Sequence, residues 1–294
     1  MVLTAARAAA STHAKTRRPV ITYLEINCLL LSLGGLNVLI DPLLEGPLDF
    51  GLPDSLYTAS KRTLPPTGLV EPLLSEVDAV IITQGLDDHA HDRTLQKMAS
   101  LGFAAPIIAP PSAKGTLLRT FPESQVRWLR PGEQTRLEAQ PGRRGDGGAI
   151  DVRACSGALV GPPWQARENG YVLRGEDGFS VYYEPHVEFN ERELRRLAPV
   201  DAVVTPIVGQ KLPGFELVHG PRAALRLVEA LRPRIVLPLE NGAIDASGVT
   251  AALVRQVGDD AEFERLLRQQ GLTNMEVRNM PPGEPVELGV DRVA

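Results

Sequence analysis

Residues 81–92, IITQGLDDHAHD, determine how the rest of the chain is interpreted. The apolar run from Ala79 to Ile82 predicts a short buried strand. A glycine-containing turn follows, and residues 93–98 predict a helix after it. The turn carries the side chains of Asp87, Asp88, His89, His91 and Asp92. Ligands in α/β proteins bind at the carboxyl ends of buried strands. Because carboxylates and imidazoles bind zinc, manganese and iron, this stretch predicts a metal site.

The same turn also has a purely structural interpretation. Asp88 could cap the following helix, while Asp87 and Asp92 stabilise its positively polarised end. A single cap would explain one acid. Adjacent acids, two histidines and a strand-end position together favour a site over capping alone.

Composition narrows the class of protein. The chain has 294 residues, of which 43% are apolar and 23% charged, as in ordinary globular proteins. Its net charge of −5 argues against nucleic acid or an anionic membrane surface as a partner. No apolar run approaches the ~20 residues of a membrane span, so we expect a soluble protein. Cys28 and Cys155 stand alone in apolar surroundings and predict buried thiols rather than a disulfide.

The N-terminus differs from the rest of the chain. Residues 1–18 are basic and hydroxylated, with no acid before Glu25. This composition is typical of an organelle transit peptide and predicts a chloroplast location. The alternative is a disordered N-terminus on a cytoplasmic protein. We expect a single domain over residues 19–294.

The order of predicted elements indicates an α/β (α+β) protein. Each half of the chain has strands first and helices afterwards, which favours two packed sheets with helices outside. Helices are expected over 222–231, 246–257 and 260–270, and residues 43–62 are expected to form a long loop beside the site.

Polar residues follow four of the predicted strands. They are Asp41, the Asp88/His89 pair, Glu184 with His186, and Glu240 with Asn241. A carboxylate at the end of a buried strand costs several kcal/mol unless a cation or hydrogen bonds compensate. These ends therefore predict a shared site. The alternative for Glu184 and Glu240 is a pair of buried carboxylates held by backbone amides or arginine.

The motifs LIDP (39–42), IITQGLDDH (81–89), VYYE (181–184) and LPLENG (237–242) resemble those of the metallo-β-lactamase-fold hydrolases. Their order is most similar to that in the ascorbate-phosphate-lactonase-like branch, found in bacteria and plastid-bearing lineages. The resemblance extends from Ile21 to the C-terminal helices. It implies a four-layer αββα sandwich with a metal site along the top of the sheets.

The family motif Thr/Ser-His-x-His-x-Asp-His is only half present. Gln84 and Leu86 occupy the two leading histidine positions, while Asp88 and His89 match the final pair. The family's mid-chain histidine would fall within residues 159–164, where none exists. The resemblance places Glu184 at the bridging aspartate and Glu240 at the last histidine.

Together these observations predict a hydrolase with one divalent metal ion (Mn, Fe, Mg or Zn) and a small ester, lactone or phosphoester substrate. The expected ligands are Asp88, His89, Glu184 and Glu240. Catalytic roles are expected for Asp87, Asp88 and His186, with His186 also a substitute ligand. Substrate contacts are expected from Gln84, Trp164, Tyr183 and Asn241.

The missing histidines also support an alternative: a catalytically inactive family member that serves as a binding or assembly protein. The sequence leaves the substrate, the metal and oligomerisation open.

Overall fold

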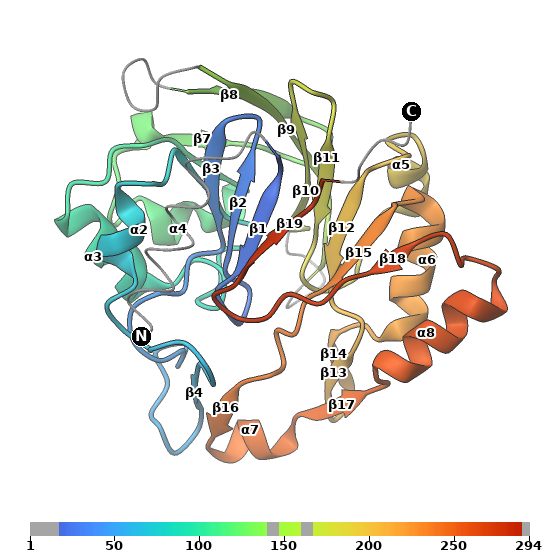
Figure 1. The fold of residues 1–294 in the computed structure, drawn as a ribbon. Helices are drawn as coiled ribbons and strands as arrows, with labels where there is room; N and C mark the ends of the chain where they lie inside the picture. Colours follow the sequence, from blue (N-terminus) through green and yellow to red (C-terminus); the bar gives the residue numbers. More distant parts are fainter. Residues whose placement is uncertain (1–17, 140–146, 160–166, 290–294) are drawn as a thin grey trace.

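The computed structural model describes residues 18–139, 147–159 and 167–289, and its centre is a pair of seven-stranded sheets packed face to face (Figure 1). The first sheet has the order β19-β1-β2-β3-β5-β6-β7. Its strands are β1 (Val20–Tyr23), β2 (Leu29–Leu33), β3 (Leu36–Ile40), β5 (Ala79–Ile81), β6 (Ile107–Ala109), β7 (Val126–Trp128) and β19 (Pro285–Glu287).

The second sheet has the order β18-β15-β12-β11-β10-β9-β8. Its strands are β8 (Gln134–Glu138), β9 (Ala149–Ser156), β10 (Asn169–Gly175), β11 (Ser180–Tyr183), β12 (Ala202–Thr205), β15 (Ile235–Pro238) and β18 (Glu276–Val277).

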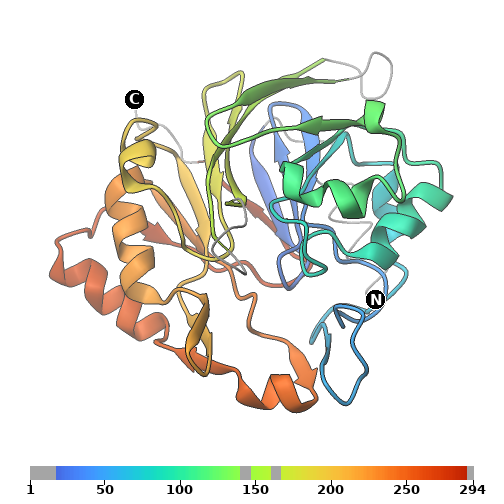
Figure 2. The ribbon, with the colours of Figure 1, turned by 180° about the vertical axis from the view of Figure 1, so that it is seen from behind.

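Helices cover the outer face of each sheet, as the view from behind also shows (Figure 2). The first sheet packs against α2 (Val70–Leu74), α3 (Asp92–Ser100) and α4 (Lys114–Leu117), and two 3₁₀ turns, η1 (Pro111–Ala113) and η2 (Glu123–Gln125), flank α4. The second sheet packs against α5 (Glu191–Arg195), α6 (Pro221–Leu231) and α8 (Asp260–Gln269). The predicted αββα sandwich is confirmed.

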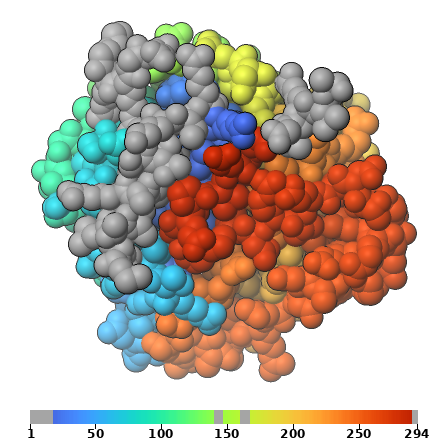
Figure 3. All heavy atoms as spheres, in the orientation of Figure 1, coloured from blue at the N-terminus to red at the C-terminus, as the bar shows by residue number. Residues whose placement is uncertain are grey.

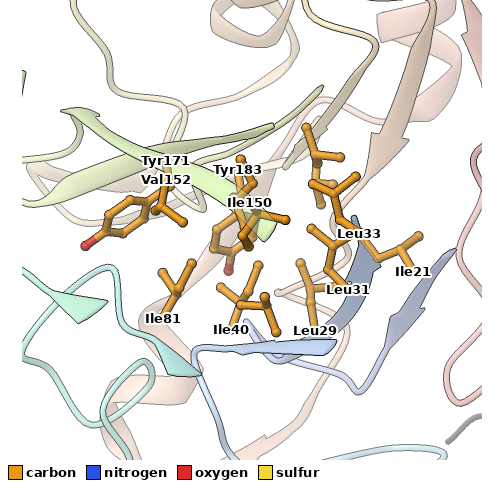
Figure 4. Close-up of a cluster of buried hydrophobic side chains, with 14 of the residues drawn as sticks. Ile21, Leu29, Leu31, Leu33, Ile40, Ile81, Ile150, Val152, Tyr171 and Tyr183 are labelled. Atoms are coloured by element: carbon orange, nitrogen blue, oxygen red, sulfur yellow. The ribbon is translucent and has the colours of Figure 1, made fainter. Parts of the chain in front are cut away.

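Alternating side chains in the strands build the core between the sheets. In β2, Leu29, Leu31 and Leu33 point into this layer, while Leu30 packs toward the helices. Figure 4 shows Leu29, Leu31 and Leu33 facing Ile150 and other side chains of the second sheet. Each buried side chain of this size contributes about 1.5–3 kcal/mol relative to an exposed one.

Parallel pairing brings the functional strand ends together. β3 runs parallel to β5 in one sheet, and β11, β12 and β15 run parallel in the other. Because parallel strands end at the same edge, the residues that follow them are delivered to one rim of the sandwich.

The main departure from expectation lies below this rim. The expected loop contains a short strand, β4 (Thr58–Ser60), which pairs with β16 (Asp245–Ser247). The helix expected over 246–257 is only α7 (Val249–Leu253), between β16 and β17 (Arg255–Val257). β17 pairs with β13 (Gly209–Leu212), which forms a hairpin with β14 (Phe215–Val218). These long-range pairings replace helical turns with strands.

Some predictions concern residues that the structure does not describe. The transit-peptide prediction rests mainly on residues 1–17, and Trp164 lies in the segment 160–166; both are outside the described residues. Within the described ranges, no helix has the length and apolar character to cross a membrane. Cys28 and Cys155 are buried free thiols, as predicted.

Candidate metal centre

The turn after β5 is shaped by a close backbone approach at Gly85. A Cβ atom there would lie 2.7 Å from the carbonyl oxygen of Ser112, so a larger residue would push the two backbones apart. The turn then carries Asp88 and His89 back over the ends of the strands. His89 is fully buried and Asp88 is partly buried.

Asp41 fixes the orientation of His89. Asp41 follows β3, is fully buried, and has a left-handed backbone (φ +44°). The Nδ1 atom of His89 donates to Asp41 Oδ2 at 2.8 Å, and the backbone N–H of Thr83 donates to Asp41 Oδ1 at 2.7 Å. The Tyr183 hydroxyl also lies 3.2 Å from Asp41 Oδ2. The other ring nitrogen, Nε2, therefore faces the rim.

On the rim side, His89 meets Asp88 and an asparagine from the first hairpin. His89 Nε2 lies 3.0 Å from Asp88 Oδ2 and 3.3 Å from Asn27 Nδ2. Burial lowers the pKa of the imidazole, but the charges of Asp88 and Asp41 outweigh burial and raise the pKa of His89 to about 10. Burial likewise raises the pKa of Asp88, but the neighbouring His89 holds it below its ordinary value.

The second sheet contributes His186, two residues beyond Glu184. Ligand atoms of Asp88, His89 and His186 all lie within 4.8 Å of one another. The rings of His89 and His186 are 5.2 Å apart, and the Gln84 side-chain nitrogen lies 2.8 Å from His186 Nδ1. Among the described residues this is the one group of His, Cys, Asp and Glu side chains arranged to hold a metal ion.

The donors fit a cation. A histidine ligand is commonly oriented by a carboxylate on its other nitrogen, and Asp41 holds His89 in this way. Asp88 Oδ1 and Gln84 Oε1 are both buried and lack hydrogen-bond partners; unpaired buried oxygens are costly. A cation would also replace the proton between His89 and Asp88, since the two compete for the same lone pair.

Several sequence-predicted residues have other partners. Glu184 folds back, and its two oxygens accept the backbone N–H groups of His186 (3.2 Å) and Glu188 (3.0 Å). This is the structural alternative considered for it. Glu240 is exposed and lies outside the Asp88 group. Asp87 accepts the backbone N–H of Asp92 at 3.1 Å and thus stabilises the start of α3.

Of the remaining predicted residues, one lies behind His89, one lines a cavity beside the cluster, and one lies away from both. The Tyr183 hydroxyl is buried behind His89, where it donates to the Asn27 carbonyl at 2.8 Å. Asn241 lies on the cavity side, and its Nδ2 donates to Asn27 Oδ1 at 3.1 Å. His91 contacts Thr94 and the Pro47 carbonyl instead of the cluster.

Sequence reasoning did not include Asn27 in the site. It stands in the hairpin Glu25-Ile26-Asn27, where the first two residues have left-handed backbones (φ +68° and +59°). No metal-binding motif marks the position. Its approach to Asp88 depends on the pairing of strands far apart in sequence.

A cavity of about 500 Å³ opens beside the cluster, in the usual size range for a small-molecule site. Asn27, Asp88, His186 and Asn241 form its polar end. Burial and the charge of Asp88 raise the pKa of Tyr57, on its wall, to about 12, so this hydroxyl is neutral at physiological pH. As predicted, residues of the 43–62 segment line this cavity.

Two packed sheets, flanking helices and an Asp/His/His cluster at the shared strand edge define a metallo-β-lactamase-like protein. The chain belongs to the beta-lactamase superfamily domain family, whose pattern matches residues 20–240. The resemblance seen in the sequence is thus confirmed at the level of the superfamily.

By sequence, the chain is 25% identical over 284 residues to the UPF0173 metal-dependent hydrolase MK1542 of Methanopyrus kandleri, covering 91% of this chain and 99% of that protein. By structure, it is similar to Igni18, a metallo hydrolase of Ignicoccus hospitalis, with TM-score 0.59, 22% identity, and coverage of 91% and 97%.

The diiron β-hydroxylase CmlA of Streptomyces venezuelae gives TM-score 0.62 at 15% identity, covering 93% of this chain and 55% of that one. Proteins with different reactions therefore share this fold, and the fold alone does not assign a reaction.

Proposed function

We propose that this chain is a metal-dependent hydrolase that holds one divalent ion with Asp88, His89 and His186. The observation that carries the proposal is the convergence of these side chains from both sheets, with ligand atoms within 4.8 Å of one another. The similarity to a metal-dependent hydrolase of Methanopyrus kandleri supports the same activity. His186 takes the role that the sequence motif suggested for Glu184.

The ligand chemistry favours zinc, iron or manganese over magnesium. Two imidazoles and one carboxylate are typical ligands of the first three ions, whereas magnesium prefers oxygen. The Leu86 side chain has no atom that can bind a metal, and the Gln84 side-chain nitrogen contacts His186 instead of forming part of a second set of metal ligands. We therefore propose a single ion, consistent with the one candidate group among the described residues.

A divalent ion in this position would lower the pKa of a bound water toward ~7 and polarise a carbonyl or phosphoryl oxygen. The protein's own residues position the donors. Asp41 holds the His89 ring, and Asn27 Nδ2 lies 3.3 Å from Asp88 Oδ2. Asn241 offers a polar contact to a substrate in the cavity. The substrate classes follow from the family: a small ester, lactone or phosphoester.

Metal analysis of the purified chain tests the proposal. We expect about one zinc, iron or manganese per chain, and metal-dependent hydrolysis of an ester, lactone or phosphoester that a chelator abolishes. His186→Ala removes a ligand, and we expect metal affinity to fall by more than the ~10–100-fold seen when only an orienting partner is lost. Glu240→Gln is the matched control, because Glu240 is exposed and outside the cluster.

A catalytically inactive binding protein is the second candidate. The observation that favours it is the replacement of two family histidines by Gln84 and Leu86, together with His89 held between two carboxylates. This candidate would be supported if the purified protein contained no metal and took up none on titration, and if His186→Ala did not change the melting temperature. The same results would refute the hydrolase.

A further inference from the structure

The walls of the cavity beside the cluster are mostly apolar. Leu48, Leu52, Leu212, Leu217 and Ile244 line it, with further aliphatic and aromatic side chains around them. Beside the cluster, Gln210 donates to Asn241 at 3.0 Å and Asn241 donates to Asn27, and the lining also includes Tyr57, Thr250 and Gln256. A molecule that fills the cavity would therefore have one polar end and a long apolar remainder.

The charges that line the cavity limit where a ligand can carry a charge. No lysine or arginine occurs among the described residues that line the cavity. The one carboxylate is Asp88. Away from the position of the proposed ion, an anionic group on a ligand would therefore meet no cationic side chain among these residues to neutralise it.

The rim of the cavity is unusually apolar for exposed surface. Phe50, Leu52 and Leu86 line the cavity and are nevertheless 40–42% exposed. Val249 of α7, which precedes the lining residues Thr250 and Ala251 in the sequence, is 62% exposed. Leu56, Phe215 and Leu253 complete the set on neighbouring segments. Exposed apolar side chains at the mouth of a cavity, such as Phe50, Leu52 and Leu86 here, favour a binding site for an apolar ligand.

Strand pairing joins these segments into one collar, which we define as residues 48–60, 209–218 and 245–257. β4 pairs with β16, and the backbone N–H of Val249 donates to the Ser55 carbonyl at 3.1 Å. β17 then pairs with β13 on the other side. Figure 3 shows the first and last of these segments side by side at the lower edge of the molecule. The segments of the collar are thus held together by backbone hydrogen bonds between strands.

We propose that the substrate is an ester or lactone with a long, uncharged apolar chain, which lies in the cavity while the reacting carbonyl meets Asp88 and His186. This inference rests on the proposed hydrolase function and narrows its substrate class. In the reaction, water forms a new bond to the acyl carbon, the acyl carbon–oxygen bond breaks, and the leaving oxygen takes a proton. An ester gives a carboxylic acid and an alcohol, and a lactone gives a single hydroxy acid.

Binding of unreactive neutral ligands tests this without relying on turnover. We suggest calorimetric titration of the metal-loaded full chain with 2-alkanones from 2-hexanone to 2-dodecanone. Burial of each added methylene should strengthen binding about threefold to fourfold, until the chain fills the cavity. 11-Hydroxy-2-undecanone, with a polar group at the far end of a chain of the same length, should bind more weakly than 2-undecanone. A flat chain-length series, or equally tight binding of 11-hydroxy-2-undecanone, would overturn the inference.

Two matched pairs of variants locate the binding site. Ala251 lines the cavity and Ala252, on the same helix, does not. Ala251→Trp should weaken 2-undecanone binding more than tenfold, while Ala252→Trp should leave it unchanged. Should Ala251→Trp not fold, Leu52→Glu at the rim and Leu101→Glu away from it form a second pair, because both leucines are about equally exposed (42% and 39%). Equal effects within a pair would count against the proposal.

The two proposals fail in different ways. Chain-length-dependent binding by protein that neither binds metal nor hydrolyses esters would refute the hydrolase function on which this inference rests. Metal-dependent hydrolysis with no preference for chain length would refute the substrate class alone.

Discussion

Asp41→Asn is the substitution that most sharply tests how the site is held together. Asp41 is fully buried and accepts hydrogen bonds from the Thr83 N–H, the Thr83 hydroxyl (2.6 Å) and His89. An asparagine of the same shape has a donor where one carboxylate oxygen stood. That NH₂ group would face groups that themselves donate, so at least one buried donor loses its partner.

The expected magnitude follows from this geometry. Breaking one side of a buried charged pair costs about 3–5 kcal/mol, and we expect the free energy of unfolding to fall by that amount. In the parent protein, Asp41 favours the His89 tautomer with its proton on Nδ1, and this tautomer leaves Nε2 free to bind a metal. The amide of asparagine would disfavour that tautomer. Loss of such an orienting partner typically weakens metal binding ~10–100-fold.

Denaturant titration of the parent protein and of Asp41→Asn measures the loss of stability, and metal titration of both proteins measures the loss of metal affinity. Asp78→Asn is a matched control at the opposite end of β5, where Asp78 accepts one backbone N–H, that of Asn37, at 2.8 Å. It should cost only about 0.5–1.5 kcal/mol and leave metal affinity unchanged. If Asp41→Asn is no more destabilising than Asp78→Asn and binds metal like the parent protein, Asp41 does not orient His89.

Three further outcomes are expected. Gly85→Ala should destabilise the chain and reduce its metal content, because the added Cβ would lie 2.7 Å from the Ser112 carbonyl; unchanged melting and metal content would contradict this. Burial raises the pKa of Cys28 to about 11 and that of Cys155 to about 12, so a thiol reagent at pH 8 should label neither in native protein and both in denaturant. Burial lowers the pKa of Lys61, whose Nζ has no hydrogen-bond partner. The folded chain therefore binds this proton more weakly than the unfolded chain, and Lys61 opposes folding increasingly as pH falls below ~10.4. Lys61→Met should raise the free energy of unfolding at pH 7 and raise it by less at pH 11; equal gains at both pH values would refute this.

The layers and the strand ends could be predicted because they depend on local apolar patterns. The run Ala79–Ile82 and the alternating leucines of β2 indicate strands by themselves. The polar residues directly after such strands must lie at a sheet edge. That argument predicted Asp88, His89 and Asn241 as site residues; in the structure, Asp88 and His89 belong to one cluster with His186, and Asn241 lines the cavity beside it.

The choice between Glu184 and His186 could not be predicted from periodicity. Both follow β11, and the motif favoured the glutamate. The backbone after Pro185 curls so that Glu184 accepts two amides, and Val187 adopts a left-handed conformation (φ +58°). His186 is thereby directed to Asp88. Such local hydrogen bonding follows from the path of the chain and not from residue spacing.

The collar was missed for a different reason. Residues 246–257 have helical composition, but both ends of this stretch form strands with distant partners. Ala246 and Ser247 pair with Ala59 and Thr58, nearly 190 residues away, and β17 pairs with β13, more than 40 residues away. Gly248, with φ +95°, lies between β16 and α7 and interrupts the helix expected there. Tertiary pairing overrides weak local propensity here, and the cavity that these segments enclose is invisible to a reading of local pattern.

An anomalous-scattering map of a crystal grown with manganese would test the central claim most directly. We expect a single peak about 2.0–2.3 Å from an oxygen of Asp88 and from one ring nitrogen each of His89 and His186. No peak between these residues, two peaks about 3.5–4 Å apart, or a peak bound by Glu240 would contradict a one-ion site built on Asp88, His89 and His186.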